Sequence, residues 1–338
     1  MRFMNFASLT VLVVLSVLVC QSPLALGGEP LRAGIIGCDT SHVIAFTKIL
    51  NSPQPDEALA GVRVVAAFPG GSPDIASSRD RVGKYTEELR GMGVEIVDSI
   101  DALLKRVDVV LLESVDGRKH LPQVRPVFAA GKRVFIDKPI AGSLADVIEI
   151  MELGKKYSTP FFSSSALRYT AAYHDARNSA EIGNVIGCAA YSPCSLEPTH
   201  PDLFWYGVHG VETLFTIMGP GCDRVTRAQT QDTELVTGVW KDGRIGTFRG
   251  LRKGGHGYGA LIFGEKSTKY ASGFGGYEPL LKQIVQFFKS GQPPVAAEET
   301  LDIFAFMEAA DESKRQGGVP VTLASVLAKA RAEVAARQ

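Results

Sequence analysis

The sequence has few cysteines and no net charge. It holds five cysteines among 338 residues, and 36 basic residues balance 36 acidic ones. It contains no Cys-x-x-Cys pair and no His/Cys cluster, so no zinc site or other metal site is expected. A neutral chain without basic patches also gives no reason to expect a nucleic-acid partner.

Long hydrophobic runs are absent except at the N-terminus. The run Leu9–Cys20 follows Arg2 and precedes small residues at Ala25 and Gly27, as in a secretory signal peptide spanning residues 1–27. The run is short for a bilayer span, and there is no twin-arginine pair. The pattern predicts Sec-type export to the periplasm or the exterior, with no stable membrane span after cleavage. An uncleaved anchor is the alternative.

Export would place the remaining cysteines in an oxidising environment. Cys188 and Cys194 are close enough in the sequence to form a disulfide. Spacing alone does not distinguish such a bridge from two buried free thiols.

Low-complexity linkers and internal repeats are absent, so the domain boundary has to come from the pattern of elements. Residues 28–165 alternate between short apolar strands and amphipathic helices, with Ser99 and Ser143 as helix caps. This pattern predicts a doubly wound, parallel, Rossmann-type sheet. Residues 166–338 contain closely spaced strands and then helices. They predict a C-terminal α/β domain with an open antiparallel sheet, so the fold class is α/β.

The first strand ends in an unusual turn within the stretch "AGIIGCDTSHV". A dinucleotide-binding turn has three small residues, but here only Gly37 is present, and Asp39 and His42 replace the other two. The N–H groups of the following helix could bind a pyrophosphate. Alternatively, Asp39 caps the helix, with Thr40 and Ser41 in its first turn. The residues of this stretch leave both interpretations open.

The second strand ends without the carboxylate that usually binds the adenosine ribose. The strand runs to Phe68 and is followed by Pro-Gly-Gly-Ser, and the first acid comes later, at Asp74. The absence of an acid would admit a 2′-phosphate near Ser72 or Arg79. It is equally compatible with no adenosine ribose at all.

The stretch "VFIDKPIAGS" places Lys138 at the end of a buried parallel strand. Parallel sheets bind ligands in the crevice at this edge. Lys138 could therefore donate a hydrogen bond to a substrate oxygen or relay a proton. A solvated lysine at a strand end is the alternative.

The order of motifs in residues 108–170 resembles the Gfo/Idh/MocA family. A turn with Asp116 and His120 leads to a helix that ends in Ala-Gly-Lys. The next strand ends in Asp137-Lys138-Pro139 in place of the family's Glu-Lys-Pro, and an Arg-aromatic pair, Arg168 and Tyr169, follows. The resemblance extends from about Leu31 to the end of the chain.

The resemblance implies NAD or NADP as cofactor, a sugar, polyol or similar substrate, and a homo-oligomer formed through the C-terminal sheet. Lys138 and His209 would be the acid–base groups. Glu212, three residues after His209 on one helical face, would orient it or bind a sugar hydroxyl. The candidate cofactor residues are Gly34, Gly37, Asp39, Thr40, Ser41, His42, Ser114, Asp137 and Lys138. The candidate substrate residues are His120, Arg168, Tyr169, Trp205 and Tyr206.

Two departures from the family pattern keep other functions open. The dinucleotide turn is altered, and Trp205 stands where the family often has an acid four residues before the histidine. NAD(P) is also scarce outside the cytoplasm. The alternatives are an exported carbohydrate-binding protein that has lost hydride chemistry and a cofactor-independent lyase or hydrolase.

Overall fold

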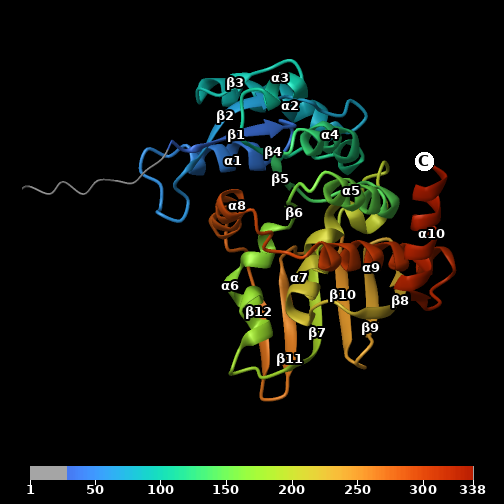
Figure 1. The fold of residues 1–338 in the computed structure, drawn as a ribbon. Helices are drawn as coiled ribbons and strands as arrows, with labels where there is room; N and C mark the ends of the chain where they lie inside the picture. The colour runs from blue at the N-terminus through green and yellow to red at the C-terminus, as the bar shows by residue number, and fades with distance from the viewer. Residues whose placement is uncertain (1–28, 338) are drawn as a thin grey trace, which may run out of the picture.

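Two β-sheets organise the protein, and the computed structural model describes residues 29–337 (Figure 1). The first sheet has six parallel strands in the order β3-β2-β1-β4-β5-β6. They are β1 (Leu31–Ile36), β2 (Val62–Phe68), β3 (Glu95–Ile96), β4 (Val109–Leu112), β5 (Arg133–Ile136) and β6 (Phe161–Ser163). The strand order reverses between β1 and β4, and a crevice for a ligand forms at such a point. The predicted Rossmann-type parallel sheet is confirmed.

Helices cover both faces of this sheet. They are α1 (Ser41–Leu50), α2 (Ala76–Gly91), α3 (Ile100–Leu104), α4 (Gly117–Ala129) and α5 (Leu144–Lys156). One hydrophobic cluster joins the sheet to α3, α4 and α5, and a second joins it to α1 and α2. Ser99 and Ser143 cap α3 and α5 by accepting backbone N–H bonds, as predicted.

The sequence analysis predicts no helix where α2 lies. Only Ser78, Thr86 and Leu89 of α2 are buried, so the helix lacks the apolar stripe by which an amphipathic helix is recognised. A connection between the parallel strands β2 and β3 nevertheless requires a crossover, and a helix is the usual one.

The second sheet has seven strands in the order β12-β11-β7-β10-β9-β8-β13. They are β7 (Val185–Pro193), β8 (Cys222–Gln229), β9 (Thr233–Trp240), β10 (Ile245–Leu251), β11 (Gly259–Gly264), β12 (Thr268–Ser272) and β13 (Val321–Thr322). All neighbours are antiparallel except β7 and β10, which are parallel. The predicted antiparallel sheet is thus mixed. A helix carries the chain from β7 to β8, and two hairpins then bring β10 back beside β7 in the same direction.

Helices cover one face of the second sheet. The helical elements after residue 165 are η1 (Ala166–Tyr169), α6 (Ala171–His174), η2 (Ala176–Asn178), η3 (Leu203–Gly207), α7 (Val208–Met218), α8 (Glu278–Ser290), α9 (Ala297–Arg315) and α10 (Leu323–Ala336). α7 and α9 pack against the strands, while α8 packs on the first sheet in the same cluster as α1. The chain therefore returns to the first sheet after completing most of the second.

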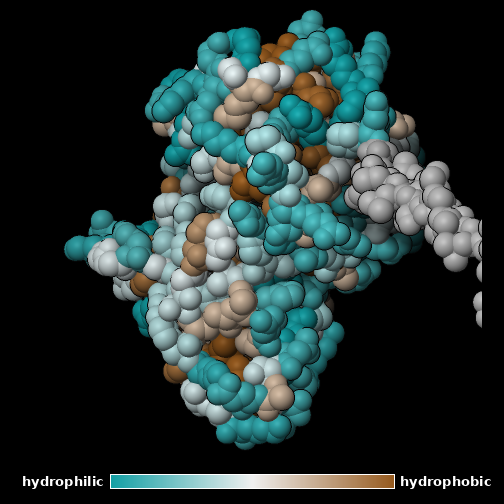
Figure 2. All heavy atoms as spheres, turned by 90° about the vertical axis from the view of Figure 1, so that its left-hand side faces the viewer, coloured by the Kyte–Doolittle hydropathy of each residue, from teal (hydrophilic) through white to brown (hydrophobic). Residues whose placement is uncertain are grey.

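The other face of the second sheet carries exposed hydrophobic side chains. They are Ile186, Ile245, Leu261, Phe263 and Tyr270, and each is between 38% and 63% exposed. On the side of the molecule shown in Figure 2, hydrophobic residues form separate patches within a mainly hydrophilic surface.

The cysteines of the described residues are free thiols. Cys38, Cys188, Cys194 and Cys222 are buried and unpaired, so the structure has no Cys188–Cys194 bridge. Within residues 29–337, no helix has the length and apolar character needed to cross a bilayer. The predicted signal peptide, residues 1–27, lies outside the described residues.

Candidate functional site

The turn after β1 is held tightly against β4. Gly37 has φ +89°, and a Cβ at this position would lie 2.5 Å from the backbone N and Cα of Ser114. The Gly37 and Cys38 N–H groups donate to the carbonyls of Phe68 and Pro69. Only glycine suits this close approach of two backbones.

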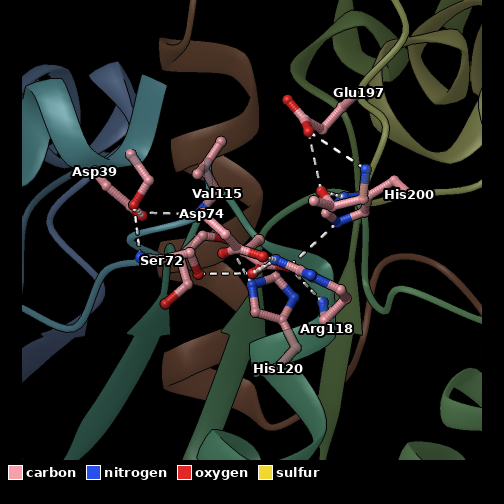
Figure 3. Close-up of polar contacts among 12 residues, drawn as sticks. Asp39, Ser72, Asp74, Val115, Arg118, His120, Glu197 and His200 are labelled. Carbon is pink, nitrogen blue, oxygen red and sulfur yellow. Dashed lines mark hydrogen bonds and ion pairs between the residues drawn. The ribbon is translucent and has the colours of Figure 1, made fainter. Parts of the chain in front are cut away.

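Asp39 does not cap the helix and does not face a ligand cavity. Its side chain is fully buried and accepts hydrogen bonds from Ser78 Oγ at 2.6 Å and from Val115 N–H at 2.9 Å. Burial raises the pKa of Asp39. The carboxylate therefore joins the β1–α1 turn to α2 and to the β4–α4 turn, as Figure 3 shows for the Val115 bond.

The N-terminus of α1 has no side-chain cap. Thr40 is the N-cap residue, but its side chain accepts no N–H bond, and the first turn contains no acid. Thr40 Oγ1 is buried without a hydrogen-bond partner in the structure. The first N–H groups of a helix lack intrahelical partners and favour negative charge, so this end of α1 suits an anionic group such as a phosphate.

The chain after β5 brings a lysine and a carboxylate to the same edge. The Lys138–Pro139 peptide bond is cis. Asp137 accepts a hydrogen bond from the Lys138 N–H at 2.8 Å and lies 2.6 Å from His42 Nδ1. Lys138 Nζ lies 5.8 Å from the centre of the Tyr206 ring. The predicted Asp-Lys-Pro motif thus meets the beginning of α1.

His209 lies opposite, on α7. Its Nδ1 is 2.7 Å from Ser165 Oγ, and its ring packs edge-on against Tyr206. Burial, reinforced by the positive charge of Lys138, lowers the pKa of His209 well below its ordinary value. The imidazole is therefore neutral near pH 7 and can accept a proton.

These groups line one cavity of about 410 Å³ between the two sheets. Its wall includes seven residues predicted from the sequence: Thr40, Ser41, His42, Lys138, Trp205, Tyr206 and His209. The sequence analysis missed Ser77, Arg81, Val115, Ser165, Ala166, Leu167, Ser195, Tyr258, Phe274 and Tyr277. Ser77 and Arg81 of α2 line the cavity, whereas Ser72 and Arg79, which the sequence analysis named as neighbours of a possible 2′-phosphate, do not. A volume in this range is typical of a small-molecule site.

Several predicted site residues are buried in the protein scaffold instead. Glu212 accepts hydrogen bonds from Ser164 Oγ, the Ser165 N–H and Arg168 Nε, each at 2.7 Å. Arg168 also contacts Glu299 at 2.7 Å, and Tyr169 is buried beside it. Glu212, Arg168 and Tyr169 do not line the cavity. The structure therefore does not place them where the predicted catalytic and substrate-binding roles require. These groups hold the segment after β6 in place, and this segment positions Ser165 against His209.

The remaining predicted residues also lie outside the cavity wall. His120 is fully buried, with its ring nitrogens at 2.8 Å from the Ser114 carbonyl and 3.2 Å from the Ile140 carbonyl. Ser114 bonds to Gln123, and Gly34 packs against Leu103 and Val107 within the sheet. They lie at the edge of the sheet and do not line the cavity.

A polar network beside the cavity links the two parts of the protein (Figure 3). Asp116, the N-cap of α4, accepts hydrogen bonds from Ser72 Oγ at 2.6 Å and from Arg118. His200, from the loop after β7, places Nε2 3.3 Å from the same carboxylate. Burial alone would raise the pKa of Asp116, but these partners outweigh burial and hold the pKa well below its ordinary value.

The fold is that of a two-domain α/β protein of the Rossmann type, and the cavity lies at the switch point of its parallel sheet. Residues 31–164 match the model of the family described as "Oxidoreductase family, NAD-binding Rossmann fold". This match supports the resemblance to the Gfo/Idh/MocA family that the motifs predict.

The chain is also similar to known proteins in sequence and in fold. Inositol 2-dehydrogenase 3 of Saccharopolyspora erythraea is 27% identical over 213 residues, which is 59% of this chain and 56% of that protein. The match thus spans little more than half of the relative. Scyllo-inositol dehydrogenase of Lactobacillus casei, solved with NAD(H) and scyllo-inositol, has TM-score 0.70 at 16% identity, over 88% of this chain and 100% of that one. Myo-inositol 2-dehydrogenase of Lactobacillus plantarum has TM-score 0.70 at 17% identity, over 87% and 99%.

Proposed function

We propose that this protein is an NAD(P)-dependent oxidoreductase that acts on a sugar, a polyol such as an inositol, or a related carbohydrate. The observation that carries the proposal is the single cavity in which the uncapped N-terminus of α1, Lys138 and His209 meet. The family and the inositol dehydrogenases among the similar proteins support the same class of reaction.

The residues around α1 fit a dinucleotide. Thr40 and Ser41 line the cavity at the helix N-terminus, where the unpartnered Thr40 Oγ1 and the free N–H groups would hold the pyrophosphate. Ser77 and Arg81 lie farther along the same wall, on the α2 side. Asp39 does not obstruct the binding of a pyrophosphate here, because its carboxylate points into the protein and accepts hydrogen bonds there.

The two acid–base groups fit the transfer of a hydroxyl proton. A nicotinamide cofactor, when bound, accepts or donates the hydride. His209 is neutral and oriented by Ser165 Oγ, so it can hold the proton of the substrate hydroxyl. Lys138, across the cavity, can stabilise negative charge on the same oxygen. Trp205 and Tyr206 offer aromatic faces to the apolar side of a sugar ring.

Calorimetric titration of the purified protein with NAD(H) and NADP(H) tests the proposal. Micromolar binding is expected, and turnover of inositols or sugars should fall at least about 100-fold in Lys138→Met and His209→Gln. The variant Lys132→Met, which changes a lysine at the end of α4 away from the cavity, is the matched control. If neither cofactor binds at millimolar concentration, the oxidoreductase proposal is refuted, and a carbohydrate-binding protein or a cofactor-independent lyase gains support.

We further propose a homo-oligomer formed through the open face of the second sheet. Ile186, Ile245, Leu261, Phe263 and Tyr270 supply the exposed hydrophobic surface on β7, β10, β11 and β12. Contiguous exposed apolar surface commonly marks an interface. Light scattering of the wild type and of Ile245→Lys tests this, since a charge at the start of β10, the middle strand of the sheet, should yield monomers.

We also propose export, on the strength of the N-terminal pattern of residues 1–27. Mass spectrometry of the N-terminus of protein made in its natural host tests this. A mature chain that begins at Gly28 supports the proposal, and a chain that retains residues 1–27 contradicts it.

A further inference from the structure

Three side chains converge at the wall of the cavity and behind it. His42 comes from the first turn of α1, Glu113 from the end of β4, and Asp137 from the end of β5. One donor atom from each lies within 4.8 Å of the other two. His42 Nδ1 is 2.6 Å from Asp137 Oδ2 and 3.8 Å from Glu113 Oε2.

Glu113 is the group that the protein leaves unsatisfied. It is fully buried, and neither of its carboxylate oxygens has a hydrogen-bond partner among the described residues. The only ion-pair contact that the described structure gives it is the one to His42. A buried carboxylate without partners is strongly unfavourable, so such groups are normally paired or bind a metal.

The neighbouring carboxylate, Asp137, makes a buried negative charge on Glu113 still less favourable. Asp137 is also buried, and burial together with the charge of Asp137 raises the pKa of Glu113 well above its ordinary value. Asp137 itself is held ionised by His42 and Lys138 against the effect of burial. Two buried carboxylates therefore share one imidazole. The charge of Lys138 acts on both, but among the described residues its Nζ forms no ion pair with either.

We propose that His42 Nδ1, Glu113 Oε2 and Asp137 Oδ2 bind a divalent cation, of which Zn²⁺ and Mn²⁺ suit this donor set best. Imidazole and carboxylate are ligands of both ions. Donor atoms about 2.0–2.2 Å from a metal lie roughly 3–3.6 Å from one another. The observed separations of 2.6 and 3.8 Å bracket that range, and the donor atoms of Glu113 and Asp137 lie within 4.8 Å of each other.

The site is open on one side only. Glu113 and Asp137 are fully buried, whereas His42 lines the cavity and is 12% exposed. The His42 ring is held by stacking on Phe46 at 5.2 Å and by an edge contact with Tyr277 at 4.9 Å. A ligand in the cavity would therefore approach the bound cation from the side of His42.

The competing explanation is a proton instead of a metal. A protonated Glu113 could donate a hydrogen bond to Asp137, which would satisfy both groups without any ion. The two explanations differ in what they predict for Glu113→Gln. A glutamine cannot replace a carboxylate ligand, but it can replace a protonated acid as a hydrogen-bond donor.

Metal binding by the full chain, measured without cofactor or substrate, tests the proposal. Chelator-treated protein is titrated with Zn²⁺ and with Mn²⁺ by calorimetry, and with Co²⁺ by visible absorption. We expect one cation per chain, and affinity at least about 100-fold weaker in both Glu113→Gln and Asp137→Asn. Asp116→Asn, which changes another buried carboxylate that is outside the cluster, should keep the affinity within about threefold.

Two results would overturn the proposal. One is the absence of binding to the wild type at millimolar cation. The other is equal binding by the wild type and Glu113→Gln. An increase in the thermal stability of Glu113→Gln together with no cation binding would identify the shared proton instead. Since no cofactor is present in this experiment, its failure leaves the oxidoreductase proposal untouched.

Discussion

Replacing Gly37 by alanine should destabilise the protein much more than the same change at Gly93. Both glycines have positive φ, +89° and +80°. At Gly93 a Cβ would meet nothing within 4 Å, but at Gly37 it would lie 2.5 Å from the Ser114 backbone. The left-handed backbone costs alanine about 1–2 kcal/mol at either position.

The clash at Gly37 adds to that cost. It involves backbone, so no side-chain rotation relieves it, and overpacking of this kind costs about 1–3 kcal/mol. We therefore expect roughly 2–5 kcal/mol for Gly37→Ala against about 1–2 kcal/mol for Gly93→Ala.

Thermal unfolding followed by circular dichroism measures the difference. At about 2–4 °C per kcal/mol, Gly37→Ala should melt several degrees below Gly93→Ala. Equal melting temperatures for the two variants would refute the close approach of the β1–α1 turn to β4.

Two further predictions concern Glu212, which is buried behind the cavity, and His209, which lines it. Glu212→Gln leaves Arg168 with Glu299 alone, so it should lower the free energy of unfolding by about 3 kcal/mol in urea titration. Glu333→Gln, in an exposed pair with Arg337, should change it by less than about 0.5 kcal/mol, and equal effects would contradict the structural role of Glu212. The depressed pKa of His209 predicts that kcat/KM stays constant on acidification to pH 6.5 and falls only well below it. The unfolded chain takes up this proton near pH 6.5, so wild-type stability should fall below that pH more steeply than that of His209→Gln.

The sequence predicted the fold correctly wherever the local pattern of apolar residues reflects how an element is buried. The strands β1, β4 and β5 are largely buried on both faces, so each appears as a short apolar run that ends at a glycine or an acid. α2 was missed because its contacts with the sheet bury few apolar side chains. The parallel pairing of β7 with β10 depends on where the chain re-enters the sheet, which no local pattern records.

The candidate site divides in the same way. Lys138 and His209 were found because each belongs to a recognisable motif, and both line the cavity. Glu212 was predicted to act beside His209 because helical spacing puts the two residues on one face. The spacing does not show that the Glu212 carboxylate is paired with Arg168. The sequence contained one indication that Glu113 is buried. It is an acid at the end of the apolar run "VDVVLLES", so it has to lie at the apolar edge of the sheet.

Cation and cofactor binding should favour each other if both proposals hold. A pyrophosphate at the N-terminus of α1 would lie near the buried carboxylates Asp39, Glu113 and Asp137. Two unit charges about 8 Å apart interact by about 2 kcal/mol at an effective dielectric constant near 20, so a cation at His42 removes a repulsion of this order.

A coupling of about 1–2 kcal/mol corresponds to roughly 5–30-fold tighter cofactor binding in the presence of the cation. Calorimetry should find the same factor when the order of addition is reversed, because equilibrium coupling is reciprocal. Glu113→Gln should remove the coupling and keep cofactor affinity near the cation-bound value, since it also removes a negative charge. Weaker cofactor binding with the cation present would mean that the two ligands compete for the space around His42, and the electrostatic argument would then be wrong.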